Sequence, residues 1–321
     1  MNFALNFFRS SFLLALIWGV VSVAGAADLP IPAPPTVAAK GYLLIDHHTG
    51  RILAEHNADE RLEPASLTKI LSAYVVFREL AEGKISLQDE VLVSKKAWQT
   101  PGSRMFIEVG KKVSLEDLLI GMIVQSGNDA SVALAEHVAG SESTFAELMN
   151  THAQRLGMEN SHFVNATGLP DPDHYITARD IAIVTAATIR EFPEYYAWYA
   201  VKEYTFNGIK QHNRNRLLWQ DDAVDGVKTG HTEAAGYCLV ASAQREDMRL
   251  TSVVMGAAGE GEYRAQVCGC LLPGGFFLGL FLVVYVGGDG RGGGGGPGQG
   301  QPESAELRLS FLRIPQALRL R

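Results

Sequence analysis

Cysteine is scarce in this chain, with three residues among 321. So few cysteines exclude a disulfide-built scaffold of the kind found in small exported proteins. Cys268 and Cys270 lie two positions apart, but no histidine or further cysteine clusters with them, which argues against a metal site. Cys238 lies in an apolar, strand-like segment, and we expect it to be a buried hydrophobic residue. We therefore expect no metal ion and no other cofactor.

A basic stripe is also missing. The formal net charge is −7, and lysine and arginine are not gathered into one segment, so the sequence does not predict a nucleic-acid partner. Hydrophobic residues make up 47% of the chain, which is enough to form a sizeable core.

The first apolar run, residues 12–23, is short for a bilayer span. It follows Arg9 and precedes the small residues Ala24, Gly25 and Ala26, which is the pattern of a secretory signal peptide. We interpret residues 1–26 as a signal peptide that is cleaved after Ala26, so the mature protein is exported. An uncleaved membrane anchor is the alternative, and the shortness of the run disfavours it.

Strand patterns flank a helix-rich middle. Period-2 segments predict strands at both ends, at residues 42–46, 51–55, 201–206, 209–212, 237–243 and 249–255. Period-3.6 segments and capping residues predict helices at residues 70–81, 118–125, 129–139, 145–156 and 177–190. This order predicts an α+β fold whose sheet is built from both ends of the chain, with a helical subdomain inserted between them.

The character of the chain changes at Cys268. Residues 271–286 are apolar but interrupted by proline and glycine, residues 287–300 are almost all glycine, and residues 307–321 are rich in arginine and leucine. The G-x-G-x-x-G match at residues 288–293 is low complexity, because no helix can follow it in more glycine and proline. We interpret residues 27–267 as one catalytic domain and residues 268–321 as an atypical tail, disordered or produced by a change of reading frame near residues 267–270.

Three short motifs carry the chemistry. The first is SLTK at residues 66–69, where Ser66 and Lys69 are three apart at the start of a predicted helix and can share one face. A serine hydroxyl needs a base to become a nucleophile. A lysine can be that base if burial or a nearby cation, such as Lys228, lowers its pKa.

The second motif is SGN at residues 126–128, between two predicted helices. Ser126 can pass a proton to a leaving amine, and Asn128 can hold Lys69 and the substrate backbone. Alternatively, Asn128 or Asp129 caps the next helix, and the two interpretations are compatible. The third motif is KTG at residues 228–230, which on an edge strand can pair with an extended peptide and face its carboxylate.

In this order and spacing, the motifs resemble those of the low-molecular-mass penicillin-binding proteins, the serine-type D-alanyl-D-alanine carboxypeptidases. The resemblance covers residues 38–267 and extends beyond the motifs, to EPASLTK at residues 63–69, QHNRN at 211–215 and DGVKTGHT at 225–232. It implies a β-lactamase/transpeptidase-like α/β sandwich, with helices on both faces of a central antiparallel sheet and an inserted all-helical subdomain.

The resemblance also implies a periplasmic enzyme that removes the terminal D-alanine from peptidoglycan stem peptides, is acylated by β-lactams and works without a cofactor. Membrane association stays open, because the family's C-terminal anchor is not recognisable here. The implied site is Ser66 as nucleophile, Lys69 as general base and Ser126 as proton relay. Substrate binding would fall to Asn128, Lys228, Thr229, Gly230, the backbone N–H of His231 in the oxyanion hole, Arg214 and Arg264.

Other functions use the same toolkit. A class A β-lactamase needs a loop glutamate for deacylation, and residues 163–170 contain none, which favours the peptidase. Endopeptidase cleavage of D-Ala cross-links would use the same residues. A non-catalytic peptidoglycan-binding protein is the alternative of another class, if the atypical tail prevents the site from folding.

Overall fold

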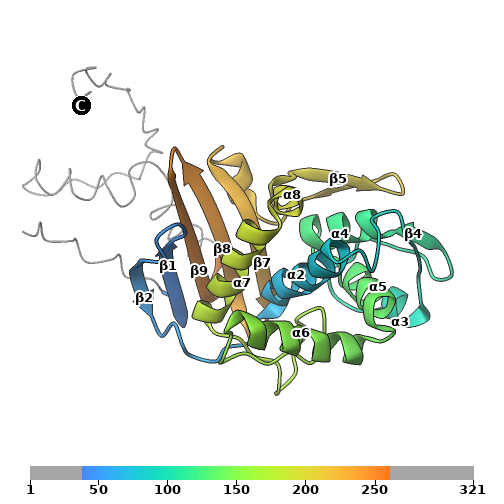
Figure 1. Cartoon of the computed structure of the whole chain (residues 1–321), viewed down its shortest axis with the longest axis horizontal. Helices are drawn as coiled ribbons and strands as arrows, with labels where there is room; N and C mark the ends of the chain where they lie inside the picture. Colours follow the sequence, from blue (N-terminus) through green and yellow to red (C-terminus); the bar gives the residue numbers. More distant parts are fainter. Residues whose placement is uncertain (1–37, 261–321) are drawn as a thin grey trace, which may run out of the picture.

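The computed structural model describes residues 38–260. Its largest sheet has five antiparallel strands in the order β2-β1-β9-β8-β7 (Figure 1). The strands are β1 (Gly41–Asp46), β2 (Ile52–His56), β7 (Val224–Thr232), β8 (Gly236–Arg245) and β9 (Met248–Ala257). Both ends of the described chain therefore build one sheet, as the sequence predicted, and β7 lies at its edge.

The helices lie between β2 and β7 in the sequence. They are η1 (Ala65–Leu67), α2 (Thr68–Ala81), α3 (Lys95–Gln99), α4 (Leu115–Val124), α5 (Asn128–Ala139), α6 (Glu142–Leu156), α7 (Ala178–Glu191), α8 (Pro193–Tyr196) and η2 (Ala197–Ala200). Two small ladders accompany them: β3 (Glu90–Leu92) with β4 (Lys112–Ser114), and β5 (Glu203–Phe206) with β6 (Ile209–His212), which η3 (Arg216–Trp219) follows.

Two predicted helices begin earlier than their apolar pattern indicated. Helix α4 begins at Leu115 and α6 at Glu142, three residues before each expected start. The side chains of Ser114 and Ser141 accept hydrogen bonds from the backbone N–H groups three residues on, both at 3.1 Å. An N-cap serine sets the start of a helix, whereas apolar periodicity becomes visible only where the helix meets the core. The short helix α3 was not predicted.

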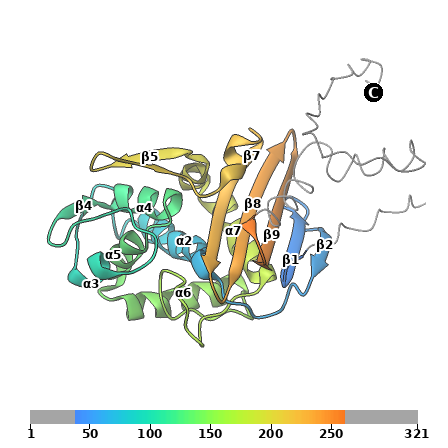
Figure 2. The ribbon, with the colours of Figure 1, turned by 180° about the vertical axis from the view of Figure 1, so that it is seen from behind.

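Residues on the two faces of the sheet alternate between two hydrophobic clusters. Leu43, Val240 and Val253 pack with the helices into the main core, and α7 lies across this face against β9 and β1 (Figures 1 and 2). Leu44, Leu239 and Val254 point to the opposite face, where Leu217 and Leu218 of η3 join them. This alternation is the period-2 pattern of a sheet with buried apolar side chains on both faces.

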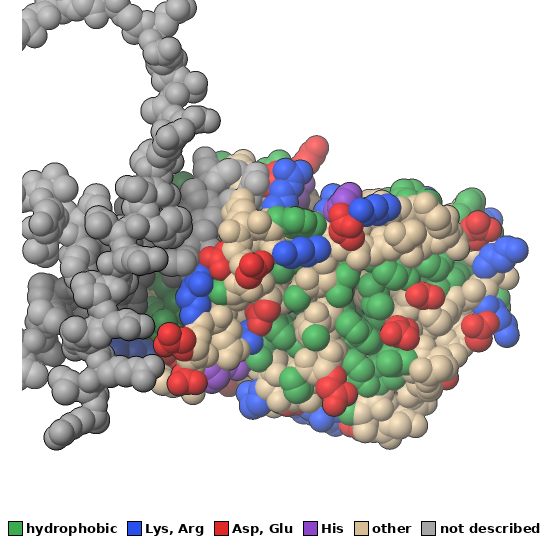
Figure 3. Space-filling model, turned by 90° about the horizontal axis from the view of Figure 1, so that it is seen from above, with side chains coloured by type: hydrophobic (Ala, Val, Ile, Leu, Met, Phe, Trp, Pro, Cys, Tyr) green, Lys and Arg blue, Asp and Glu red, His purple; other side chains and the backbone are tan. Residues whose placement is uncertain are grey.

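Two further sequence predictions are confirmed. Asn207 and Gly208, at φ +48° and +75°, form the tight turn between β5 and β6, which correspond to the strands expected at residues 201–206 and 209–212. Cys238 is buried. Figure 3, seen from the side of the β5–β6 hairpin, shows acidic and basic side chains dispersed among apolar ones. Within residues 38–260, no helix is long and apolar enough to cross a membrane.

Candidate active site

Ser66 lies in the turn where η1 passes into α2, directly beside the edge strand β7. The residue before it, Ala65, has φ +45°, a left-handed conformation that side chains rarely adopt. A Cβ added at Gly230 of β7 would lie 3.1 Å from the Ser66 backbone nitrogen and 3.2 Å from the Ala65 Cβ. Glycine at position 230 thus lets the strand approach the nucleophile turn closely.

The Lys69 ammonium or amine group joins the first two motifs. Lys69 Nζ lies 2.9 Å from Ser66 Oγ, 2.7 Å from Asn128 Oδ1 and 2.6 Å from the backbone oxygen of Thr167. Lys69 is only 1% exposed. Asn128 is itself held, because its Nδ2 donates to the carbonyl of Pro101 at 2.6 Å. The side chain that could act as base therefore has a fixed place against the hydroxyl.

Burial holds the pKa of Lys69 well below its usual range, and the positive charge of Lys228 lowers it further, while Asp129 opposes the shift. A neutral amine has two hydrogens and one lone pair. Asn128 Oδ1 and the Thr167 carbonyl can only accept hydrogen bonds, so they take the two hydrogens. The lone pair is then left for the hydroxyl hydrogen of Ser66, which is the arrangement a general base needs.

Ser126 lines the same cleft as Ser66 and has φ +66°. Its hydroxyl oxygen is buried and has no hydrogen-bond partner within the part of the chain that the structure describes. A hydroxyl that is not engaged elsewhere can both accept and donate a proton.

The idea that Asn128 or Asp129 caps the next helix is wrong. Gly127 is the N-cap of α5, with no side-chain cap bond. The Asp129 carboxylate accepts hydrogen bonds from the backbone N–H groups of Met105, Phe106 and Ile107, at 2.9–3.3 Å. Asp129 thereby ties the loop before β4 to the second motif, because that loop offers three amides and the carboxylate has the charge to bind them.

Lys228 is 2% exposed, and its Nζ donates to the Thr229 carbonyl at 3.1 Å. Burial, with a smaller contribution from the charge of Arg214, lowers the pKa of Lys228 to about 7. Thr229, Gly230 and His231 line the cleft next to Ser66. The ring of His231 lies against Tyr237, with 4.1 Å between the centroids.

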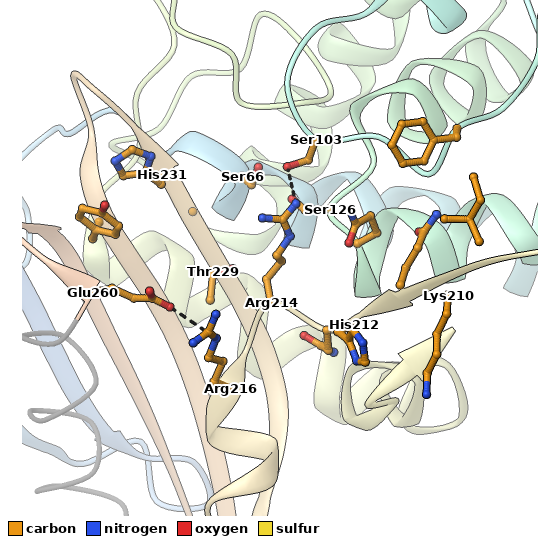
Figure 4. A pocket seen from close by; sticks show the side chains of 17 residues that line it. Ser66, Ser103, Ser126, Lys210, His212, Arg214, Arg216, Thr229, His231 and Glu260 are labelled. Atoms are coloured by element: carbon orange, nitrogen blue, oxygen red, sulfur yellow. Dashed lines mark hydrogen bonds and ion pairs between the residues drawn. The ribbon is translucent and has the colours of Figure 1, made fainter. Parts of the chain in front are cut away.

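The cleft has a volume of about 620 Å³. Figure 4 shows Arg214 reaching toward Ser66 and Ser126, with Lys210, His212 and Arg216 on the same side. The structure thus brings nine of the ten residues from the sequence analysis to one place: Ser66, Lys69, Ser126, Asn128, Arg214, Lys228, Thr229, Gly230 and His231. Arg264, residues 1–26 and residues 268–321 lie outside the described residues. Within residues 38–260, no three His, Cys, Asp or Glu side chains could hold a metal ion together.

The contribution of the loop between α6 and α7 was not predicted. From the sequence, residues 163–170 were notable only for containing no glutamate, yet the Thr167 carbonyl is bound by Lys69. A backbone carbonyl has no residue identity to search for. The usable signal is Asn165 before Thr167-Gly168, which is typical of a turn closed by an asparagine side chain.

Solved structures of penicillin-binding proteins share the fold of this chain. The solved structure of penicillin binding protein 5 from Haemophilus influenzae superposes with a TM-score of 0.72 at 46% identity, over 74% of this chain and 71% of that one. Penicillin-Binding Protein D2 from Listeria monocytogenes, in its ampicillin-bound form, gives a TM-score of 0.68 at 27% identity, over 73% and 96% of the two chains. The protein has the penicillin-binding, transpeptidase-like fold.

The family follows from the sequence comparison. The family model for D-alanyl-D-alanine carboxypeptidase matches residues 29–259. The D-alanyl-D-alanine carboxypeptidase DacC of Escherichia coli (strain K12) is 50% identical over 250 residues, which are 76% of this chain and 62% of that protein. The chain belongs to the D-alanyl-D-alanine carboxypeptidase family, and it spans about three fifths of the length of that curated relative.

Proposed function

We propose that the chain is an exported serine carboxypeptidase that removes the terminal D-alanine from peptidoglycan stem peptides ending in D-Ala-D-Ala. The observation that carries this proposal is the buried Lys69 amine, bound between Asn128 and the Thr167 carbonyl and 2.9 Å from Ser66 Oγ. Membership of the family supplies the substrate class.

In the proposed reaction, Lys69 takes the hydroxyl proton as Ser66 Oγ attacks the carbonyl of the penultimate D-alanine. The backbone N–H groups of Ser66 and His231 stabilise the oxyanion, a term worth roughly 3–4 kcal/mol per donor in such sites. The Ser126 hydroxyl donates its proton to the leaving amine and takes the proton from Lys69 in return, so terminal D-alanine departs and Lys69 is again a neutral amine. Water, deprotonated by Lys69, then hydrolyses the ester.

The carboxylate of the leaving D-alanine would bind among the cationic and hydroxyl groups of the cleft. Lys228, Thr229 and Arg214 supply them, and Asn128 is placed to bind the substrate backbone. β-Lactams present the same acyl donor and carboxylate, so we propose that they acylate Ser66. The ampicillin-bound relative of the same fold supports this part of the proposal.

A class A β-lactamase is disfavoured by the loop between α6 and α7. A backbone carbonyl, not a glutamate carboxylate, meets Lys69 there. A carbonyl cannot remove a proton from the hydrolytic water, so the loop adds no second base to Lys69, and we expect the penicilloyl-enzyme to be hydrolysed slowly.

A fluorescent penicillin tests the proposal when the full chain and its Ser66→Ala variant are compared by gel fluorescence. We expect the wild-type chain to be labelled and the Ser66→Ala variant to stay unlabelled. The label should be lost slowly, and the wild-type chain should release free D-alanine from a pentapeptide ending in D-Ala-D-Ala. Rapid loss of label without D-alanine release would indicate a β-lactamase. Absence of Ser66-dependent label on folded protein would overturn the enzyme assignment.

A further inference from the structure

Within the loop between α6 and α7, the side chain of Asn165 closes the turn at residues 165–169. Asn165 Oδ1 accepts hydrogen bonds from the Thr167 N–H at 3.1 Å, the Thr167 hydroxyl at 3.0 Å and the Gly168 N–H at 2.8 Å. Asn165 Nδ2 donates to the Leu169 carbonyl at 3.0 Å. Four hydrogen bonds from one amide thus determine the backbone on both sides of the Thr167 carbonyl.

The same loop packs tightly against the turn at residues 65–68, which carries Ser66. Gly168 has φ +82°, and a Cβ added to it would overlap the Ala65 carbonyl group and lie 2.8 Å from Thr68 Oγ1. Thr68 Oγ1 is in turn 3.0 Å from Nε2 of His174, which lies further along the same loop. No space separates the loop from the turn that carries Ser66, so a displaced loop would displace the carbonyl that Lys69 binds.

We propose that Asn165 is a positioning residue for catalysis: through the Thr167 carbonyl it aims the lone pair of Lys69 at the hydroxyl of Ser66. This inference rests on the proposed function of the same site. Lys69 as a neutral amine has two hydrogens, and Asn128 Oδ1 takes one. If the Thr167 carbonyl moves away, the second hydrogen is free to turn toward Ser66 Oγ, and the lone pair then points elsewhere. The base is still present and still buried, but it is misaligned.

The loop also offers a matched control. Asn150 of α6 holds the beginning of the same loop, because its Nδ2 donates to the Phe163 carbonyl at 2.8 Å and its Oδ1 accepts from the Phe163 N–H at 2.9 Å. No hydrogen bond joins the Asn150 side chain to residues 165–169 within the described chain. Removing the Asn150 amide therefore loosens the loop without touching the turn around Thr167.

Stopped-flow labelling with a fluorescent penicillin separates the two expectations. It gives K, the dissociation constant of the noncovalent complex, and k2, the rate constant of acylation. We expect Asn165→Ala to lower k2 about 10- to 100-fold, which is part of the roughly 10²- to 10⁴-fold that a general base contributes, and to change K by less than about twofold. Asn150→Ala should lower the melting temperature but leave k2 within about threefold of the wild-type value.

The conservative variant Asn165→Asp keeps the oxygen that accepts three of the four hydrogen bonds, and it should recover most of the lost k2. If Asn165→Ala does not fold, Asn165→Ser replaces it, since a serine hydroxyl closes such turns more weakly and should give a smaller loss confined to k2. The inference is overturned if the alanine variants at 165 and 150 lose k2 equally, if the loss lies in K, or if Asn165→Asp recovers nothing. A wild-type chain that is not labelled would instead overturn the proposed function, so the two failures are distinguishable.

Discussion

The two sides of the cleft are built in opposite ways. On the helical wall, formed by Ser66, Lys69, Asn128 and the Thr167 carbonyl, the polar groups bind one another, and Lys69, Asn128 and Thr167 are 5% exposed or less. On the cationic wall, formed by Lys210, Arg214 and Arg216, the side chains are exposed.

Rigidity is needed on the wall that transfers the proton. Proton transfer requires a donor and an acceptor within about 3 Å in a set orientation, and a buried, partnered group provides that before substrate arrives. A carboxylate can be attracted by exposed cations from many orientations. Exposed ion pairs such as Lys210 with Glu203, at 2.6 Å, are worth about 0–1 kcal/mol and are readily exchanged for a ligand. We infer that the helical wall performs the chemistry and the cationic wall guides the substrate.

The largest expected effect comes from removing the base. We expect Lys69→Ala to lower k2 about 10²- to 10⁴-fold, the usual contribution of a general base. Lys69→Arg is the informative partner, because a guanidinium places a permanent positive charge at this position and cannot be deprotonated. Stopped-flow labelling should find both variants equally slow. An active Lys69→Arg variant would mean that position 69 contributes charge and not basicity.

The next effect tests the contact behind the helical wall. Gly168→Ala should lower the free energy of unfolding by about 3–4 kcal/mol, because the methyl group meets the Ala65 carbonyl and φ is left-handed. Gly157→Ala is the matched control, since its φ is +83° and nothing lies within 4 Å of the added Cβ, so it should lose only about 1 kcal/mol. Urea unfolding measures both. Equal losses would show that the loop does not press on the nucleophile turn.

A third effect concerns pH. Burial lowers the pKa of His174 to about 4, so below pH 6.5 the unfolded chain binds a proton that the folded chain does not. Folding stability should therefore fall as the pH drops from about 6.5 to 4, by about 3 kcal/mol in total from this residue. His174→Gln should flatten that part of the pH profile of urea unfolding. An unchanged slope in the variant would exclude His174 as its source.

The smallest effect concerns the affinity of the site for a substrate that has a terminal carboxylate. The pKa of Lys228 is lowered to about 7, so its positive charge is present below that pH and is lost above it. For a substrate with a terminal carboxylate, the dissociation constant K should therefore rise as the pH rises through about 7, at most about tenfold per pH unit. Lys228→Arg keeps its charge and should make K nearly independent of pH in this range. A wild-type K that is constant from pH 6 to 9 would exclude Lys228 as a carboxylate ligand.

The sequence predicted the sheet from both ends and the main helices, because apolar periodicity and capping residues are local signals. The serine–lysine spacing marked the nucleophile turn in the same way. The missing parts are long-range. Asp129 accepts hydrogen bonds from the backbone N–H groups of residues 105–107. The Thr167 carbonyl accepts a hydrogen bond from Lys69, 98 positions earlier in the chain. Partners of that kind are set by tertiary packing, and neither side carries a local sequence pattern.

The division of labour between the two walls is tested most directly by measuring k2 and K separately for Lys69→Ala and Arg214→Ala with the same fluorescent penicillin. The account predicts that Lys69→Ala lowers k2 and leaves K within about twofold of the wild-type value. Arg214→Ala should raise K about tenfold and leave k2 within about threefold of the wild-type value. A loss of k2 in Arg214→Ala as large as that in Lys69→Ala would contradict the account.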